Sequence, residues 1–265
     1  MLRDDIHLNP VRDSAGWPFG SPLRGCALPP VGAFDKETEA ASHARHMNRI
    51  TLSLVALAAV VFLTGCATKQ SGGGRYDAVA YKPRNPSDVR VKVSLQNRAV
   101  YVMEGDRPLL VTATAIGTPA KPTPKGNFRV YNKIAKKRSG SYGFSVSGDR
   151  IVPVKASAAT GRYVGFPMAY WVEFSPAYGF HEGSVWPMPR THGCLRLHKN
   201  VAPKFYELAR MGTPVQIAET QPEDATIGRN LKRPTDYADP DPANSILISD
   251  GIFTQPSGPL LVEQQ

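Results

Sequence analysis

The residues best suited to chemistry lie in one short stretch, RTHGCLRLHKN, which spans 190–200. Cys194 stands there between a His-Gly pair and a Leu-Arg pair. A nucleophilic cysteine has to form a thiolate, be reachable, and have a base and donors for a developing oxyanion nearby. Nearby residue types offer each of these parts, so the stretch indicates cysteine acyl transfer.

Each part has a candidate residue. His181 ends a predicted strand and is expected to face Cys194 across a sheet as its base. Gly193 permits a tight turn, so that the backbone N–H groups of Gly193, Cys194 and Leu195 point at an oxyanion, a contribution of about 3–4 kcal/mol per donor. Arg196, two residues on, shares the face of the cysteine on a strand. Its charge is suited to hold a substrate carboxylate or to lower the pKa of the thiol.

Two other interpretations stay open on the residues alone. Cys194 fits a buried structural cysteine, and His181, His192, Cys194 and His198 invite a zinc site, although a single thiolate at this spacing fits no common one. We expect His198, at the start of a predicted helix, to be a surface residue. A redox role is disfavoured because no second thiol is placed to resolve an intermediate.

The chain has three cysteines: Cys26 near the start, Cys66, and Cys194. Proteins exported to an oxidising compartment normally pair their thiols. If Cys66 is modified and Cys26 is absent from the mature chain, Cys194 has no partner. An unpaired cysteine in that setting indicates a reactive thiol.

Export is predicted by residues 47–66, MNRITLSLVALAAVVFLTGC. The apolar stretch suits a signal-peptide core and is short for a span of about 20 residues; a core helix or a membrane anchor is the alternative. Its end, LTGC, resembles the lipobox of bacterial lipoproteins, which implies cleavage before Cys66 and lipidation of that residue. Ala67 at the next position implies the outer membrane, so we expect a periplasmic, lipid-anchored protein.

Composition divides the rest of the chain. We predict that 1–46 is an over-extended start with Met47 as the natural first residue, that 47–65 is the signal peptide, and that 66–87, rich in Gly, Ser and Pro, is a tether. From 220–265 six prolines and no sustained period predict an irregular tail, which we expect to wrap the domain. The net charge of +10 favours acidic partners such as wall polymers or anionic lipid.

The middle of the chain is predicted to be mainly β. The 23 glycines and 24 prolines of the whole chain and its weak helical period favour short strands joined by turns. Strands are expected at 89–95, 99–103, 109–116, 128–132, 151–154, 169–174, 178–181 and 213–217. Residues 117–127 and most of 139–169 are predicted to be loops. One helix is predicted over 201–211, capped by Asn200 and ended by Gly212.

These segments carry a resemblance. Residues 191–196, Thr-His-Gly-Cys-Leu-Arg, resemble the signature of L,D-transpeptidases of the YkuD type. Residues 123–128, Thr-Pro-Lys-Gly-Asn-Phe, resemble the T-P-x-G-x-F segment of that family, and the strands and His181 come in the expected order. The resemblance covers about 88–218. It departs at Glu182, where the family usually has glycine, and in a short segment between His181 and Thr191, so we expect both differences at the rim of the site.

The resemblance implies a β-sandwich with one or two short helices over 88–219. It implies an L,D-transpeptidase that uses Cys194 as nucleophile, His181 as base oriented by a backbone carbonyl, and Gly193 in the catalytic turn. Implied substrate-binding residues are Thr191, His192, Arg196, Tyr170 and Trp171, with core packing equally expected for the two aromatic residues. No metal, cofactor or nucleic acid is implied.

The implied reaction forms an acyl-enzyme on a peptidoglycan stem peptide at diaminopimelate, releases D-Ala and passes the acyl group to an amine. That amine belongs to a second stem peptide or to a lipoprotein. Two alternatives stay open: a carboxypeptidase that uses water on the same bond, and a wall-binding lipoprotein without turnover.

Overall fold

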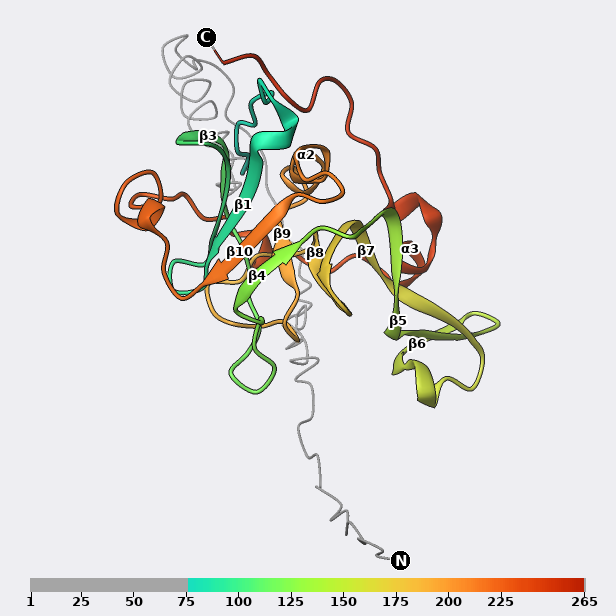
Figure 1. Cartoon of the computed structure of the whole chain (residues 1–265). Coiled ribbons are helices and arrows are strands. Elements are labelled where there is room, and N and C mark those ends of the chain that lie inside the picture. The colour runs from blue at the N-terminus through green and yellow to red at the C-terminus, as the bar shows by residue number, and fades with distance from the viewer. Residues whose placement is uncertain (1–75, 265) are drawn as a thin grey trace, which may run out of the picture. The chain divides into compact units, whose positions relative to one another are not determined.

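A computed structural model of the chain describes residues 76–264, which form two five-stranded sheets (Figure 1). The predicted mainly-β fold with few helices is confirmed. The predicted leader 1–46, the signal peptide 47–65 and the lipidation site Cys66 lie outside the described residues. Among 76–264 no helix combines the length and the hydropathy that crossing a membrane requires.

The first sheet has the strand order β3-β2-β1-β10-β4, in which β1 and β10 run parallel and the other neighbours run antiparallel. Its strands are β1 (Val89–Ser94), β2 (Ala99–Glu104), β3 (Arg107–Ala113), β4 (Gly126–Arg129) and β10 (Pro214–Ala218). Alternating apolar residues in β1 place valines at 89, 91 and 93 in the core, as their period of two predicts.

The second sheet, of order β6-β5-β7-β8-β9, carries the predicted site. Its strands are β5 (Asn132–Ser147), β6 (Arg150–Lys155), β7 (Arg162–Ser175), β8 (Tyr178–Glu182) and β9 (Leu195–Leu197). β8 and β9 are parallel, and the other neighbours are antiparallel. The β5–β6 hairpin extends away from the first sheet (Figure 1).

The prediction of loops over 139–169 is wrong, because most of that segment belongs to β5, β6 and β7. Gly143 and Gly165 indicated loops by composition, yet they are the residues that let β5 and β7 approach closely. A Cβ on Gly143 would lie 2.2 Å, and one on Gly165 2.0 Å, from a backbone oxygen of the opposite strand. Glycine inside a strand can mark such a close approach as well as a turn.

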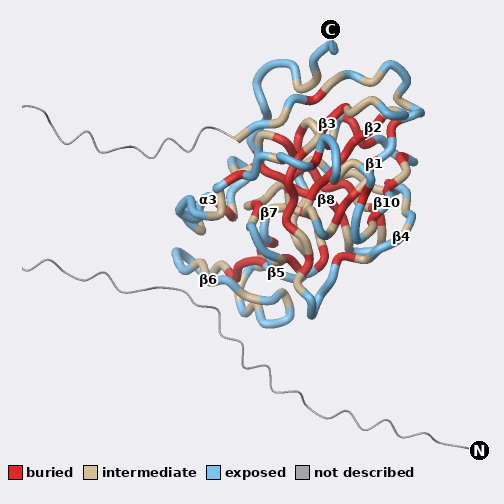
Figure 2. Tube along the Cα trace, turned by 90° about the vertical axis from the view of Figure 1, so that its left-hand side faces the viewer, coloured by how far each residue is buried: buried red, intermediate tan, exposed pale blue. Residues whose placement is uncertain are grey.

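The core lies between the two sheets and the helix α2 (Ala202–Leu208). Figure 2 shows the buried parts of the strands in red. Phe180 of β8 meets Phe205 of α2 with ring centroids 4.5 Å apart. The predicted cap is wrong: Val201 occupies the N-cap position without a side-chain hydrogen bond, and Asn200 donates to the Tyr76 carbonyl instead. The helix ends at Leu208, before the predicted Gly212.

The C-terminal segment is irregular but makes specific contacts. It forms short 3-10 helices η3 (Pro222–Ala225), η4 (Asp236–Ala238) and η5 (Asp250–Ile252) and the helix α3 (Asn244–Ile248), which packs beside β7 (Figure 1). Near its end Val262 bridges to Tyr81, and Ala80 bridges to Leu110. The predicted tether therefore ends earlier than expected, because residues 80 and 81 already belong to the folded part.

Candidate active site

The predicted nucleophile and base lie at the end of two adjacent parallel strands. His181 is in β8, and Cys194 directly precedes β9. In the β8–β9 register His181 stands opposite Arg196. Because side chains alternate along a strand, His181 and Arg196 point to the same face of the sheet, and the residue two positions before Arg196 is Cys194. The structure thus brings together the three residues that the sequence analysis singled out.

His181 is held by a backbone carbonyl, as predicted. Its Nδ1 lies 2.7 Å from the Glu182 carbonyl oxygen. A carbonyl only accepts, so Nδ1 carries the proton and Nε2 keeps the lone pair that a base needs. Burial, and then the charge of Arg196, lower the pKa of His181 to about 3, against the raising effect of the Glu182 carbonyl. The imidazole is therefore neutral at neutral pH.

Cys194 is half-buried, and its Sγ donates to the Ala177 carbonyl at 3.7 Å. Burial raises the pKa of the thiol, although the Gly179 N–H and the charges of Arg196 and Lys137 act to lower it. The resting group is thus a thiol whose hydrogen bond goes to the β7–β8 turn. To react, it has to turn toward the free Nε2 of His181, an adjustment typical of sites without substrate.

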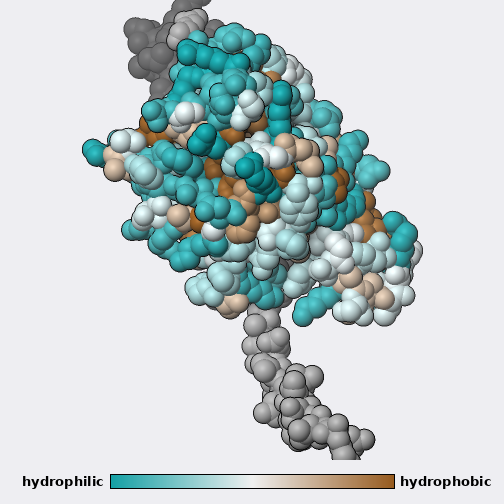
Figure 3. Space-filling view, viewed as in Figure 1, coloured by the Kyte–Doolittle hydropathy of each residue, from teal (hydrophilic) through white to brown (hydrophobic). Residues whose placement is uncertain are grey.

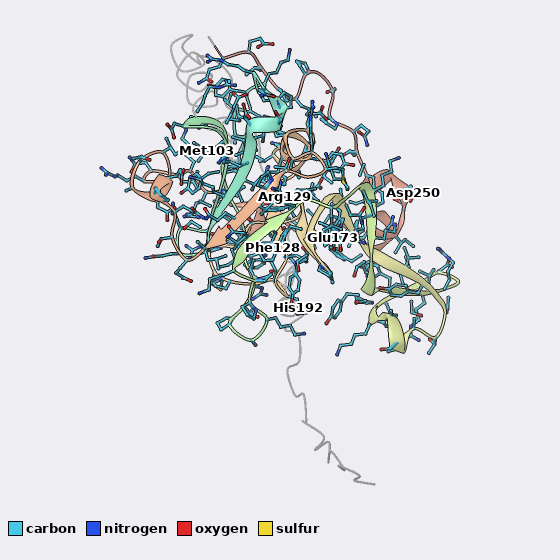
Figure 4. The ribbon with its side chains drawn as sticks, in the orientation of Figure 1. Met103, Phe128, Arg129, Glu173, His192 and Asp250 are labelled. Carbon is cyan, nitrogen blue, oxygen red and sulfur yellow. The ribbon has the colours of Figure 1, made fainter. Side chains whose placement is uncertain are left out.

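Glu173 positions that turn and was missed by the sequence analysis. Its carboxylate accepts the Ala177 N–H at 3.1 Å, the Asn132 side-chain amide at 2.9 Å and the Trp171 indole at 3.2 Å. Burial acts to raise the pKa of Glu173, but these donors outweigh it and lower the pKa. Figure 4 shows Glu173 among the strands of the second sheet. Its only sequence signal is an acid inside the aromatic strand AYWVEF.

Ala177, whose carbonyl accepts the hydrogen bond from the thiol, has a φ of +65°. A residue with a Cβ pays of order 1–2 kcal/mol in this left-handed region. The Glu173 carboxylate, by accepting the Ala177 N–H, holds the turn in that conformation and aims the Ala177 carbonyl at Cys194.

Thr191 and Gly193 shape the turn that presents the thiol. The Thr191 hydroxyl donates to the Cys194 carbonyl at 2.6 Å and accepts the Gly193 N–H at 3.1 Å. Thr191 is 3% exposed, so its predicted contact with substrate is wrong; it holds the turn. The prediction of Gly193 as an oxyanion donor is also wrong, because its N–H is already bonded. The role of Gly193 is conformational, with a φ of +107°.

The two predicted substrate-binding aromatics are core residues. Tyr170 is 7% exposed, and its hydroxyl donates to the Thr254 carbonyl at 3.1 Å. Trp171 is 1% exposed, and its ring centroid lies 6.1 Å from that of His181. Their predicted place along the substrate approach is therefore wrong, and the alternative, core packing, is confirmed. Trp171 supports the His181 ring from inside the sheet.

His192 is exposed, below Phe128 in the view of Figure 4, with its ring centroid 5.1 Å from that of Tyr142 in β5. Burial, and then Lys121, Arg196 and Lys155, lower the pKa of His192. These cations come from the 117–125 loop, β9 and β6, so this rim of the site is positively charged.

His198 is not the surface residue that was predicted. It is 5% exposed, accepts the Asn200 N–H through Nδ1 at 3.1 Å, and packs edge-on against Tyr76. Its carbonyl accepts the N–H groups of Val201 and Ala202, where the chain turns into α2. Among residues 76–264 no cluster of His, Cys, Asp and Glu is arranged to hold a metal ion.

The Glu182 side chain does not belong to the rim of the site, where it was predicted. It follows His181 in β8 and therefore points to the opposite face of the sheet. Burial raises the pKa of Glu182 to about 7, against the lowering effect of Lys199. The contribution of this residue to the site is its backbone carbonyl, which any residue type supplies.

Comparison with known families agrees with this geometry. Residues 88–217 match the YkuD family, described as the L,D-transpeptidase catalytic domain. Residues 88–217 belong to the L,D-transpeptidase catalytic domain family. The match ends before η3, so the whole C-terminal segment lies outside the family domain. No curated protein sequence matches the chain.

Solved L,D-transpeptidase structures resemble this transpeptidase domain. One from Stackebrandtia nassauensis is 19% identical with a TM-score of 0.39, covering 54% of this chain and 60% of that one. One from Mycobacterium smegmatis is 17% identical with a TM-score of 0.39, covering 49% and 58%. An Enterococcus faecium mutant enzyme is 23% identical with a TM-score of 0.37, covering 49% and 50%. The match thus spans 50–60% of these relatives.

Proposed function

We propose that the protein is a peptidoglycan L,D-transpeptidase with Cys194 as nucleophile and His181 as base. The observation that carries the proposal is the hydrogen bond from His181 Nδ1–H to the Glu182 carbonyl, which leaves Nε2 free on the face of the sheet that bears the only thiol among the described residues. The membership of 88–217 in the transpeptidase domain family supplies the reaction class.

In the proposed reaction the Cys194 sulfur attacks the carbonyl carbon that links the L-centre of diaminopimelate to D-Ala. His181 Nε2 takes the thiol proton and returns it to the departing amine as the C–N bond breaks, so D-Ala leaves and a thioester forms. An acceptor amine then attacks the thioester, loses a proton to His181, and restores the thiol. The Cys194 N–H, which has no backbone partner among residues 76–264, is positioned to stabilise the oxyanion.

The cellular setting is part of the proposal. The signal peptide and lipobox indicate lipidation at Cys66 and a periplasmic site of action, with the enzyme facing wall material from the outer membrane. We propose this placement on the sequence pattern of residues 47–66. Globomycin, which blocks cleavage of lipoprotein precursors, should cause a larger precursor to accumulate; unchanged processing would contradict lipidation.

The first test is intact-mass spectrometry of the full chain after incubation with a carbapenem, a class expected to acylate the catalytic cysteine of this family. The expected result is one covalent adduct that maps to Cys194 and is absent from Cys194→Ala. No adduct on a thiol that iodoacetamide still alkylates would overturn the proposal.

The second test separates transfer from hydrolysis. A donor tetrapeptide ending in D-Ala is incubated with the enzyme, with and without an acceptor amine, and products are identified by mass. A cross-linked product supports transfer, whereas D-Ala release that needs no amine assigns the carboxypeptidase activity. Cys194→Ser, which keeps the size of the side chain but not the thiol, should lose at least about a thousandfold in rate.

A further inference from the structure

The loop between the base and the catalytic turn, 183–190, passes directly over Arg196. A Cβ on Gly183 would lie 3.0 Å from the Arg196 side chain. The loop is tied back to the domain at its end, where the Arg190 N–H donates to the Ile116 carbonyl at 2.9 Å. The conformation of this short loop therefore determines which side chains lie beside the Cys194 thiol.

The loop is held from outside the family domain, by η4 of the C-terminal segment. Asp236 accepts the N–H of Val185, a buried loop residue, at 3.2 Å. The next residue, Tyr237, packs its ring on Trp186 with centroids 5.3 Å apart and planes at 35°. Two consecutive residues of η4 thus fix two consecutive residues of the loop, one through the backbone and one through the ring.

The stack continues to an exposed cation. The Arg190 guanidinium lies over the Trp186 ring, 4.4 Å from its centroid. A guanidinium stacked on an aromatic face loses less conformational freedom when it binds a planar anion. Tyr237, Trp186 and Arg190 form a continuous stack that begins in the C-terminal segment and ends one residue before Thr191.

Arg190 and Arg196 are both bonded to the same short segment, because the Arg190 N–H donates to the Ile116 carbonyl at 2.9 Å and the Arg196 N–H donates to the Ala115 carbonyl at 3.1 Å. Burial lowers the pKa of Arg196, the Cys194 thiolate raises it, and the charge of Arg190 lowers it again. Within residues 76–264 neither guanidinium forms an ion pair with a carboxylate. Two cations that flank the catalytic turn on either side in the chain, without a protein counter-ion, favour a substrate anion.

We propose that Arg190 is a specificity-determining residue that binds, with Arg196, a carboxylate of the substrate beside Cys194, and that Asp236 and Tyr237 are positioning residues that hold Arg190 there through Trp186. The inference rests on the proposed function, which supplies a peptide substrate that bears carboxylates. It gives the C-terminal segment, which lies outside the family domain, a part in substrate selection.

The first experiment does not require turnover. The full chain is alkylated with iodoacetate and with iodoacetamide, and the ratio of the two rates at Cys194 is measured. Changes in the exposure or the pKa of the thiol affect both rates alike. The ratio therefore reports how strongly the site attracts the carboxylate of iodoacetate. Removing a nearby cation in Arg190→Met should lower the ratio about 3- to 10-fold. Arg90→Met, which removes an exposed charge on β1, is the matched control and should leave it unchanged.

The positioning role is tested at Tyr237. Tyr237→Ala removes the ring that supports Trp186 and should lower the ratio by more than twofold, whereas Tyr237→Phe keeps the ring and should retain the wild-type ratio. An unchanged ratio in Arg190→Met overturns the carboxylate site. A lowered ratio in Arg190→Met with an unchanged ratio in Tyr237→Ala overturns the positioning role alone.

The second experiment uses donor peptides that differ only in a carboxylate or a carboxamide next to the scissile bond. Arg190→Met should raise KM about tenfold for the carboxylate peptide, change kcat little, and leave KM for the amide unchanged. An equal loss on both peptides contradicts carboxylate recognition. If the wild type forms no acyl adduct at all, the proposed function fails, and the alkylation ratio still decides the role of Arg190.

Discussion

At the scale of single residues, the site combines a neutral base with a thiol whose pKa burial has raised. His181 has a pKa of about 3, so it does not titrate near neutral pH. The proton on Cys194 leaves only as the nucleophile reacts or as the pH rises. The resting site therefore contains no ion pair between His181 and Cys194. The Glu182 carbonyl and the Arg196 cation favour the reacting state.

The pH dependence of alkylation follows from this arrangement. The rate with iodoacetamide should rise in one step centred above about 8.5, the ordinary pKa of cysteine, because burial raises the pKa of Cys194. Arg196→Met removes a cation that favours the thiolate, so the step should move to higher pH and the rate at pH 7 should fall. A second step between pH 5 and 7 would contradict a neutral His181.

Gly193 should be irreplaceable for two separable reasons. Its φ of +107° strains any residue with a side chain, and a Cβ there would lie 2.4 Å from the Tyr178 ring. Gly212 has a φ of +84° but no atom within 4 Å of a Cβ. Gly212→Ala should therefore cost about 1 kcal/mol in unfolding free energy and keep full carbapenem acylation.

Gly193→Ala should instead displace Tyr178 or the catalytic turn and lower the acylation rate at least about a hundredfold. Urea unfolding and intact-mass kinetics measure both variants. Equal effects of the two substitutions on acylation would show that strain alone, without the contact to Tyr178, accounts for glycine at position 193.

At the scale of elements, the sequence predicts what is local and misses what is made by pairing. The order of short strands, the position of α2 and the turn that bears Cys194 follow from hydrophobic period and turn residues. The length of β5 and β7 does not, because Gly143 and Gly165 resemble loop residues until the opposite strand is known. The role of Glu173 cannot be predicted from the sequence either, because its hydrogen-bond donors come from β5, from β7 and from the turn after β7.

The C-terminal segment is also tied to the second sheet through Arg138 of β5. Its guanidinium donates to four backbone carbonyl oxygens, those of Gly165, Leu247, Ile248 and Ser249. It also lies 4.8 Å from the centroid of the Phe253 ring, near Asp250, which Figure 4 marks at the α3 side. Arg138 therefore clamps the C-terminal segment onto β5.

Arg138→Met should therefore lower the free energy of unfolding by about 1–3 kcal/mol, because several charge-assisted hydrogen bonds are lost together. It should also expose 243–254 to limited proteolysis. Arg150→Met, at an exposed position of the same hairpin, is the matched control and should change neither. Urea unfolding and mass mapping of early cleavage products measure the effects. Protection of 243–254 in Arg138→Met would contradict the clamp.

At the scale of the whole molecule, the folded unit is larger than the family domain. The face in Figure 3 is mostly hydrophilic, with scattered hydrophobic side chains. Phe253 of the C-terminal segment is a buried member of the core. Close to its start, Asp224 accepts from Tyr101, Ser94 and the Gln221 N–H. Burial acts to raise the pKa of Asp224, but these donors outweigh it and lower the pKa.

Truncation should separate the parts of this segment. A chain that ends at Ala218, near the end of the family domain, loses the Asp224 network and the buried Phe253. It should lose at least about 3 kcal/mol of unfolding free energy, the scale of removing one large core side chain. A chain that ends at Thr254 keeps these contacts and loses the Val262 bridge to Tyr81, so it should unfold within about 1 kcal/mol of the full chain.

The chain that ends at Thr254 keeps η4 and its contact with Trp186. It should therefore also keep the wild-type ratio of iodoacetate to iodoacetamide alkylation at Cys194. Urea unfolding of the three chains, followed by that ratio on the folded ones, makes the comparison. Equal stability of the chain ending at Ala218 and the full chain would show that the family domain folds without the C-terminal segment. In the expected outcome, the same segment that completes the core also carries η4 to the loop beside Cys194, so stability and substrate selection depend on one piece of chain.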